Sequence, residues 1–183
     1  APNGTTAITL VKNNGDLIAN IEDGIVINVV DDLGNALLAQ GILAIAQNDF
    51  NLNLNTAADI TSDGNGAVGL GIEAVAQDGG GVTLVNTGDV TAFTSGDSAR
   101  AISAFVESAM GGPLSITNSG SISAQSGGVG ERDFATAGLL AVSQAAGNTI
   151  TVDNSGDISV TSADGRFDTD FNGIAAGIVT NSF

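Results

Sequence analysis

The sequence predicts an all-β protein: a right-handed parallel β-helix of about five three-stranded coils, with residues 1–183 forming a single solenoid domain. Two observations lead to this fold class. The 183 residues include 26 Gly and only 4% aromatic residues, so a core of Val, Ile, Leu and Ala must alternate with many tight turns. In addition, one short pattern recurs five times along the whole chain, as expected of a solenoid.

Each copy of the pattern begins with a short strand whose apolar residues are two apart, the spacing that buries one face of a strand. A turn rich in Asn, Gly and Asp follows, and a second strand starts directly after it. The coils are expected to start at the first strands, near residues 8, 52, 82, 114 and 150. The second strands are led by Leu17, Ile60, Val90, Ile122 and Ile158.

A third strand closes each coil and reads Gly or Ala, a branched residue, any residue and then Ala. Its copies are expected at 41–44, 71–74, 101–104, 138–141 and 173–176. The separation between second and third strands varies from 12 to 25 residues while the other spacings hardly change, so insertions have accumulated at one corner. In the first copy, residues 21–35 form such an insertion, which we expect to cover the first coil because it contains an apolar run.

Equivalent positions in a solenoid form columns along its axis, and two columns at the turn after the first strand are informative. Stacked Asn side chains can hydrogen-bond one another and the turn backbone. The first column is expected to contain Asn13, Thr56, Asn86, Asn118 and Asn154. The second contains Asp16, Asp59, Asp89, Ser121 and Asp157. Its carboxylates would either accept hydrogen bonds from nearby backbone N–H groups or bind a cation.

The sharpest metal-binding motif lies at residues 168–173, where the side-chain oxygens of Asp168, Asp170 and Asn172 alternate as in a calcium-binding loop. Calcium is therefore the one candidate cofactor. The motif is incomplete, because Val179 stands at position twelve, where such a loop has a bidentate Glu. A plain polar insertion at the variable corner explains the run equally well.

Three of the four cationic residues fall in the same variable corner, beside several carboxylates: Arg100, Arg132 and Arg166. Mixed charge of this kind either marks a contact edge or belongs to an ordinary solvated loop. In the second case each exposed ion pair would contribute only about 0 to 1 kcal/mol.

Composition and charge argue against several function classes. The absence of His and Cys removes the imidazole base, the Cys nucleophile and the usual zinc site. A net charge of −16 repels nucleic acid and anionic lipid. The longest nearly apolar stretch, 36–46, is about half of the roughly 20 residues that a spanning helix needs. We therefore expect no enzymatic activity, no nucleic-acid partner and no membrane insertion.

The aligned copies from Val82 to Asp164 resemble the passenger domains of bacterial autotransporters. Their coils often read as an apolar strand, then N-[TS]-G-[DSN]-I, then a Gly-Ile-x-Ala strand, and the segments that carry this resemblance best are 82–90, 114–122 and 150–158. The resemblance implies a protein that is secreted, extracellular or on the bacterial cell surface. It also implies a role in adhesion or as a structural stalk.

The chain begins just before an expected first strand and stops about where the next would start, so we expect whole coils with unpaired terminal strands. This favours a non-enzymatic extracellular structural subunit that stacks head to tail with copies of itself into a filament or surface layer. One alternative is a segment of an adhesin passenger that binds a cell-surface or host ligand. Another is a glycan-cleaving β-helix enzyme, which would need an acid–base pair and usually aromatic residues that grip sugar.

Overall fold

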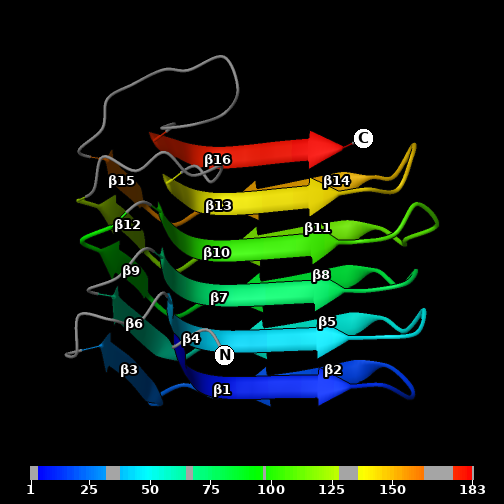
Figure 1. Cartoon of the computed structure of the whole chain (residues 1–183), viewed down its shortest axis with the longest axis horizontal. Helices are drawn as coiled ribbons and strands as arrows, with labels where there is room; N and C mark the ends of the chain where they lie inside the picture. Colours follow the sequence, from blue (N-terminus) through cyan, green and yellow to red (C-terminus); the bar gives the residue numbers. More distant parts are fainter. Residues whose placement is uncertain are drawn as a thin grey trace.

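The computed structural model describes residues 4–31, 38–64, 68–96, 98–127, 136–162 and 175–182. Within these ranges the chain has no helix and forms sixteen strands in three parallel sheets. The chain visits the sheets in a fixed order, so it winds as a β-solenoid with three strands per coil (Figure 1). In Figure 1 the nearest sheet runs left to right, the chain returns behind it, and each coil lies above the last. The predicted right-handed parallel β-helix is confirmed.

The three sheets, named A, B and C, each stack equivalent strands of successive coils. Sheet A has six strands in the described part of the chain: β1 (Gly4–Lys12), β4 (Leu38–Ala46), β7 (Val68–Ala76), β10 (Ser98–Val106), β13 (Thr136–Ser143) and β16 (Ala175–Ser182). Sheet B has five: β2 (Leu17–Ile21), β5 (Leu52–Thr56), β8 (Val82–Asn86), β11 (Leu114–Asn118) and β14 (Ile150–Asn154). Sheet C has five: β3 (Val26–Asp31), β6 (Asp59–Gly64), β9 (Val90–Thr94), β12 (Ile122–Ser126) and β15 (Ile158–Ser162).

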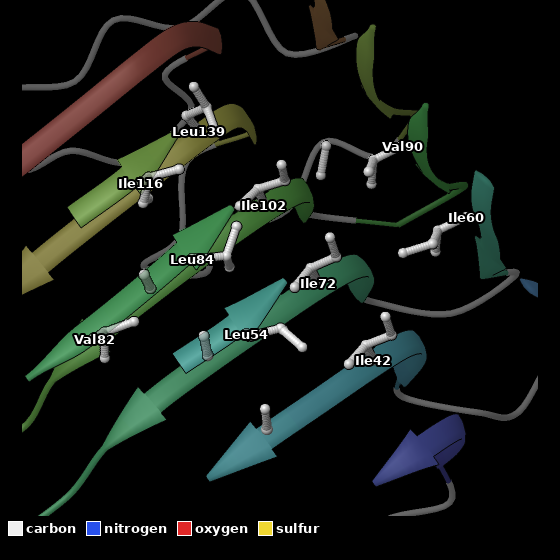
Figure 2. Close-up of a cluster of buried hydrophobic side chains, with 14 of the residues drawn as sticks. Ile42, Leu54, Ile60, Ile72, Val82, Leu84, Val90, Ile102, Ile116 and Leu139 are labelled. Atoms are coloured by element: carbon white, nitrogen blue, oxygen red, sulfur yellow. The ribbon is translucent and has the colours of Figure 1, made fainter. Parts of the chain in front are cut away.

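The interior is filled by apolar side chains that stack in columns from coil to coil (Figure 2). One column, in sheet A, contains Ile42, Ile72, Ile102 and Leu139, and all four side chains are 0% exposed. In the central coils, the strands of sheets B and C alternate buried and more exposed residues with period two. The alternation read from the sequence therefore sets which face of each strand packs inward.

The register of the first coil differs from the expected alignment. The strand at Ile8 pairs with β4 in sheet A, with Ile8 opposite Ile42. The first strand of sheet B is β2, where Leu17 lies opposite Leu52. Residues 26–31 form β3, an ordinary strand of sheet C, so the expected covering insertion at 21–35 is wrong. The first coil starts near residue 17 and not near residue 8.

A longer turn explains this error. Residues 22–25 separate β2 from β3, whereas residues 57–58 alone separate β5 from β6. The two extra residues destroy the regular spacing between the first and second strands of this coil. The turn at residues 13–16 connects sheet A to sheet B, but it has the composition expected of the turn between sheets B and C.

The last strand of sheet A is also shifted from its expected position. Residues 173–176 were expected to align with 138–141, but the structure pairs Leu139 with Ile178 and Ala141 with Thr180. The dipeptide Gly-Ile occurs twice, at 173–174 and again at 177–178. The first copy fits the repeat pattern, whereas backbone pairing uses the second.

Candidate functional site

The Asn column is a continuous hydrogen-bonded ladder through three coils. Nδ2 of Asn86 donates to Oδ1 of Asn118, and Nδ2 of Asn118 donates to Oδ1 of Asn154, each over 2.7 Å. Each Asn also donates to the carbonyl oxygen of the residue two positions later, over 2.6 to 2.7 Å, and these residues are Gly88, Gly120 and Gly156. Because Asn86 and Asn118 are buried, the ladder satisfies turn carbonyls that water cannot reach.

The structure places Thr56 in this column but not Asn13. Ile21 of β2 lies opposite Thr56, while Asn13 lies at the corner between sheets A and B, where its carbonyl accepts a hydrogen bond from Nδ2 of Asn48 over 2.8 Å. Oδ1 of Asn86 is buried, and no hydrogen-bond partner for it lies among the described residues. The ladder therefore ends on an unsatisfied acceptor above Thr56.

We expect Thr56→Asn to raise the free energy of unfolding by about 1 kcal/mol. The new amide would lie one coil below Asn86, as Asn86 lies below Asn118, and its Nδ2 would donate to the unsatisfied Oδ1. Urea denaturation measures the change. Thr61→Asn, at an exposed position in β6, is the matched control and should leave stability unchanged. Destabilisation by Thr56→Asn would contradict the interpretation.

The predicted carboxylate column divides between two corners. Oδ1 of Asp59 accepts a hydrogen bond from the backbone N–H of Asp89 over 3.1 Å, and Oδ1 of Asp89 accepts one from Ser121 over 2.8 Å. Asp16 lies at the other corner, where its Oδ1 accepts from the backbone N–H of Asn51 over 2.9 Å. In both places a carboxylate accepts a hydrogen bond from a backbone N–H group of the next coil. This is the first of the two alternatives expected from the sequence, the second being a bound cation.

The candidate calcium ligands lie outside the described residues, and so do two of the three arginines of the predicted contact corner: Asp168, Asp170, Asn172, Arg132 and Arg166. In the part of the chain that the structure describes, no cluster of three or more Asp, Glu, His or Cys residues is arranged to hold a metal ion.

Arg100, the third arginine, lies on β10 and is buried, with 6% of its surface exposed. Its guanidinium carbon is 5.8 Å from the centroid of the Phe105 ring. Burial lowers the pKa of Arg100, and the carboxylate of Glu73 acts in the opposite direction. Glu73 also accepts a hydrogen bond over 2.7 Å from Nε2 of Gln40, whose Oε1 accepts one over 3.2 Å from Thr6. Arg100 thus belongs to a packed polar row across sheet A and is not a solvated loop residue.

A second amide ladder was missed in the sequence. Nε2 of Gln47 donates to Oε1 of Gln77 over 2.9 Å, and Nε2 of Gln77 donates to Oε2 of Glu107 over 3.1 Å. These three residues directly follow strands β4, β7 and β10. The available signal was their 30-residue spacing at the position directly after each third strand.

Both ends of the described rod leave part of its apolar interior accessible. At the C-terminal end Ile178 is 47% exposed, although Leu139 in the same column is 0% exposed. Other inward-facing residues at this end are partly buried: Ile150, Val152, Ile158 and Val160. The partly buried residues at the N-terminal end are Ile8, Leu10, Ala19 and Ile21.

The first coil is also apolar on its outer surface. Four of the seven exposed large hydrophobic residues in the described ranges belong to it, Ile18, Ile25, Val26 and Val30, and a fifth, Val11, lies on the preceding strand β1. The column that begins with Ile18 continues with Asn53 and Thr83 in the next coils. The two ends of the rod therefore differ, because the outward-facing residues of β14 and β15 are polar.

A shallow depression of about 120 Å³ lies beside the turn that follows β5. Its lining contains no carboxylate and no cationic side chain: Asn20, Ile21, Asn55, Thr56, Ala57, Val85 and Thr87. It therefore offers no acid–base pair of the kind that cleavage of a glycosidic bond requires.

No family model, no curated protein and no solved structure matches the chain. In the ranges described, no helix has the length and apolar character needed to cross a bilayer. Open, chemically distinct rod ends and stacked polar ladders are the features that bear on function.

Proposed function

We propose that this chain is a non-enzymatic, extracellular structural subunit that stacks head to tail with copies of itself into a bacterial filament or surface layer. Calcium, at Asp168, Asp170 and Asn172, remains its one candidate cofactor. The observation that carries the proposal is the open interior at both rod ends, where Ile178 is 47% exposed beside the fully buried Leu139. Terminal strands with free backbone groups act as templates for further strands.

The chemistry of the ends supports a heterologous contact. The Asn ladder reaches the C-terminal end at Asn154, and the first coil at the opposite end carries the exposed apolar side chains. Because the two ends differ, joining one to the other is a heterologous contact, and a contact that continues the stack along the rod axis repeats without closing and produces a fibre.

The resemblance of the coils to autotransporter passenger domains supports a location outside the bacterial cell or on its surface. The resemblance covers an architecture that hosts many functions. It therefore supports the location more strongly than any particular ligand.

We expect Val160→Asp to abolish filament growth. Val160 faces inward from the terminal strand β15 and is only partly buried in the single subunit, so an Asp there can remain hydrated until a second copy covers it. Covering it would bury an unpaired charge, which costs several kcal/mol. Electron microscopy and sedimentation velocity over a range of concentrations measure the effect, at roughly 0.15 M salt where the screening length is about 8 Å.

Thr161→Asp is the matched control, because the neighbouring Thr161 is exposed on the outer face of the same strand. This variant should assemble like the unmodified protein, and circular dichroism should show that both variants are folded. A monomer that stays isolated at every concentration would contradict the proposal and favour the adhesin-segment alternative.

A further inference from the structure

The unequal numbers of strands in the three sheets restrict how two copies can join. Sheet A has six described strands, whereas sheets B and C have five each. Sheet A ends with β1, which pairs with β4, at one end of the rod and with β16, which pairs with β13, at the other. Along the chain, β1 directly precedes β2 and β3, and β16 directly follows β14 and β15.

Continuous stacking in sheets B and C creates a conflict in sheet A. If β2 and β3 of a following copy pair with β14 and β15, both of these sheets continue at the ordinary strand spacing. The following copy's β1 then falls at the level that β16 already occupies. Only one of these two strands can lie between β13 and the following copy's β4.

The arrangement that retains both strands leaves a gap in the core. Pairing β1 directly on β16 would move the following copy's β2 to about 9.6 Å from β14, which is two strand spacings. The partly buried Val152 and Val160 would then face a layer that no described strand fills. Protein interiors are close-packed, and an unfilled layer forfeits the contacts of its lining side chains.

The interior columns favour β16 over β1 at this position. The column that contains Lys12 of β1 and Ser182 of β16 is otherwise occupied by small or apolar residues that are at most 1% exposed: Ala46, Ala76, Val106 and Ser143. Enclosing Lys12 between two coils would bury an unpaired ammonium group, whereas Ser182 resembles Ser143.

The neighbouring column gives the same preference. It contains fully buried alanines in four coils: Ala44, Ala74, Ala104 and Ala141. Leu10 of β1 and Thr180 of β16 are the terminal members of this column. Leu10 would overpack a space that fits alanine in every internal coil, and overpacking destabilises a core. Thr180 adds less volume.

We propose that subunits join by strand exchange, in which β16 of one copy pairs with the following copy's β4 and displaces its β1. In the free subunit β1 covers the N-terminal edge of sheet A, where Lys12 is exposed. Assembly then requires this strand to leave. The inference rests on the proposed head-to-tail stacking and specifies its junction.

Disulfide cross-linking distinguishes the three junctions, because the chain contains no Cys. Thr9, Leu43, Leu140 and Val179 occupy one column on the outer face of sheet A. Strand exchange by β16 predicts intermolecular disulfides in filaments of Leu43→Cys/Val179→Cys. Pairing of β1 on β16 predicts them instead in Thr9→Cys/Val179→Cys, and displacement of β16 predicts them in Thr9→Cys/Leu140→Cys.

Locking β1 in place tests whether it must leave. Thr9 lies opposite Leu43, and the spacing of adjacent strands suits a disulfide. Oxidised Thr9→Cys/Leu43→Cys should elongate at least about tenfold more slowly than the same protein after reduction, because the lock keeps β4 covered. Val85→Cys/Thr117→Cys joins adjacent internal strands of sheet B and is the control, whose growth should not depend on its redox state.

The outcomes separate the two proposals. Unmodified protein that never forms filaments contradicts head-to-tail stacking and the exchange together. Filaments that cross-link through Thr9→Cys, or that grow equally fast with β1 locked, leave stacking intact and overturn strand exchange alone.

Discussion

Gly120→Ala is expected to lower the free energy of unfolding by about 3 kcal/mol. A Cβ at Gly120 would lie 1.9 Å from the carbonyl oxygen of Gly88 in the coil below. Gly156 makes the same approach to Gly120, at 2.0 Å. Because each obstructing atom belongs to the backbone of a stacked turn, no side chain can move aside to relieve the overlap. Chemical denaturation with an unchanged m-value measures the loss.

Ser119→Ala is the matched control for this substitution. Ser119 is the exposed neighbour of Gly120 in the same turn, so its replacement should change stability by less than about 0.5 kcal/mol. Ala58 occupies the position equivalent to Gly88 in the coil that stacks on the longer β2–β3 turn, and its Cβ is accommodated there. Equal stability of Gly120→Ala and the unmodified protein would show that the turns do not stack closely.

Asn118→Ala is expected to cost about 3 kcal/mol, because Asn118 is the central member of the Asn ladder. It accepts a hydrogen bond from Asn86 and donates to Asn154 and to the carbonyl of Gly120. Its removal takes a donor from the carbonyl of the buried Gly120 and breaks the hydrogen bonds to Asn86 and Asn154 in the two adjacent coils. Thermal and urea unfolding, compared with the unmodified protein, measure the change.

Asn154→Ala provides a graded comparison within the same ladder. Asn154 is only partly buried in the last coil, where water can replace the lost hydrogen bonds. We therefore expect a cost of about 1 kcal/mol. If both substitutions cost the same, burial of the ladder does not determine its contribution to stability.

The regular coils were predictable to the residue. Aligning Leu52, Val82, Leu114 and Ile150 by their spacing reproduces the backbone register of sheet B. The Asn column from Asn86 to Asn154 follows from the same alignment. The alignment is correct because the turn between sheets B and C keeps the same spacing in these four coils. Residues that match in the repeat pattern are therefore also the residues that pair between strands.

The site was only partly predictable. Asn13 has the right residue type and follows an alternating strand, but its strand belongs to sheet A. Arg100 was expected in a charged corner and instead packs against Phe105 on β10. In both cases the sequence identifies a polar side chain that takes part in interactions between coils. Which residues it contacts depends on the neighbouring coils, and the sequence pattern does not show these.

By itself, the sequence determined the repeat, the three-strand coil and the side chains that face inward, because these depend on local alternation and on recurring turns. Only the tertiary structure decided which terminal strands pair and that, among the described residues, sheet A has one strand more than its neighbours. Pairing in a solenoid joins residues about one coil apart, and several alignments of a terminal strand keep its apolar residues inward. Hydrogen bonding and packing against the adjacent coil select one of these alignments, and that selection defines the ends at which a second copy would join.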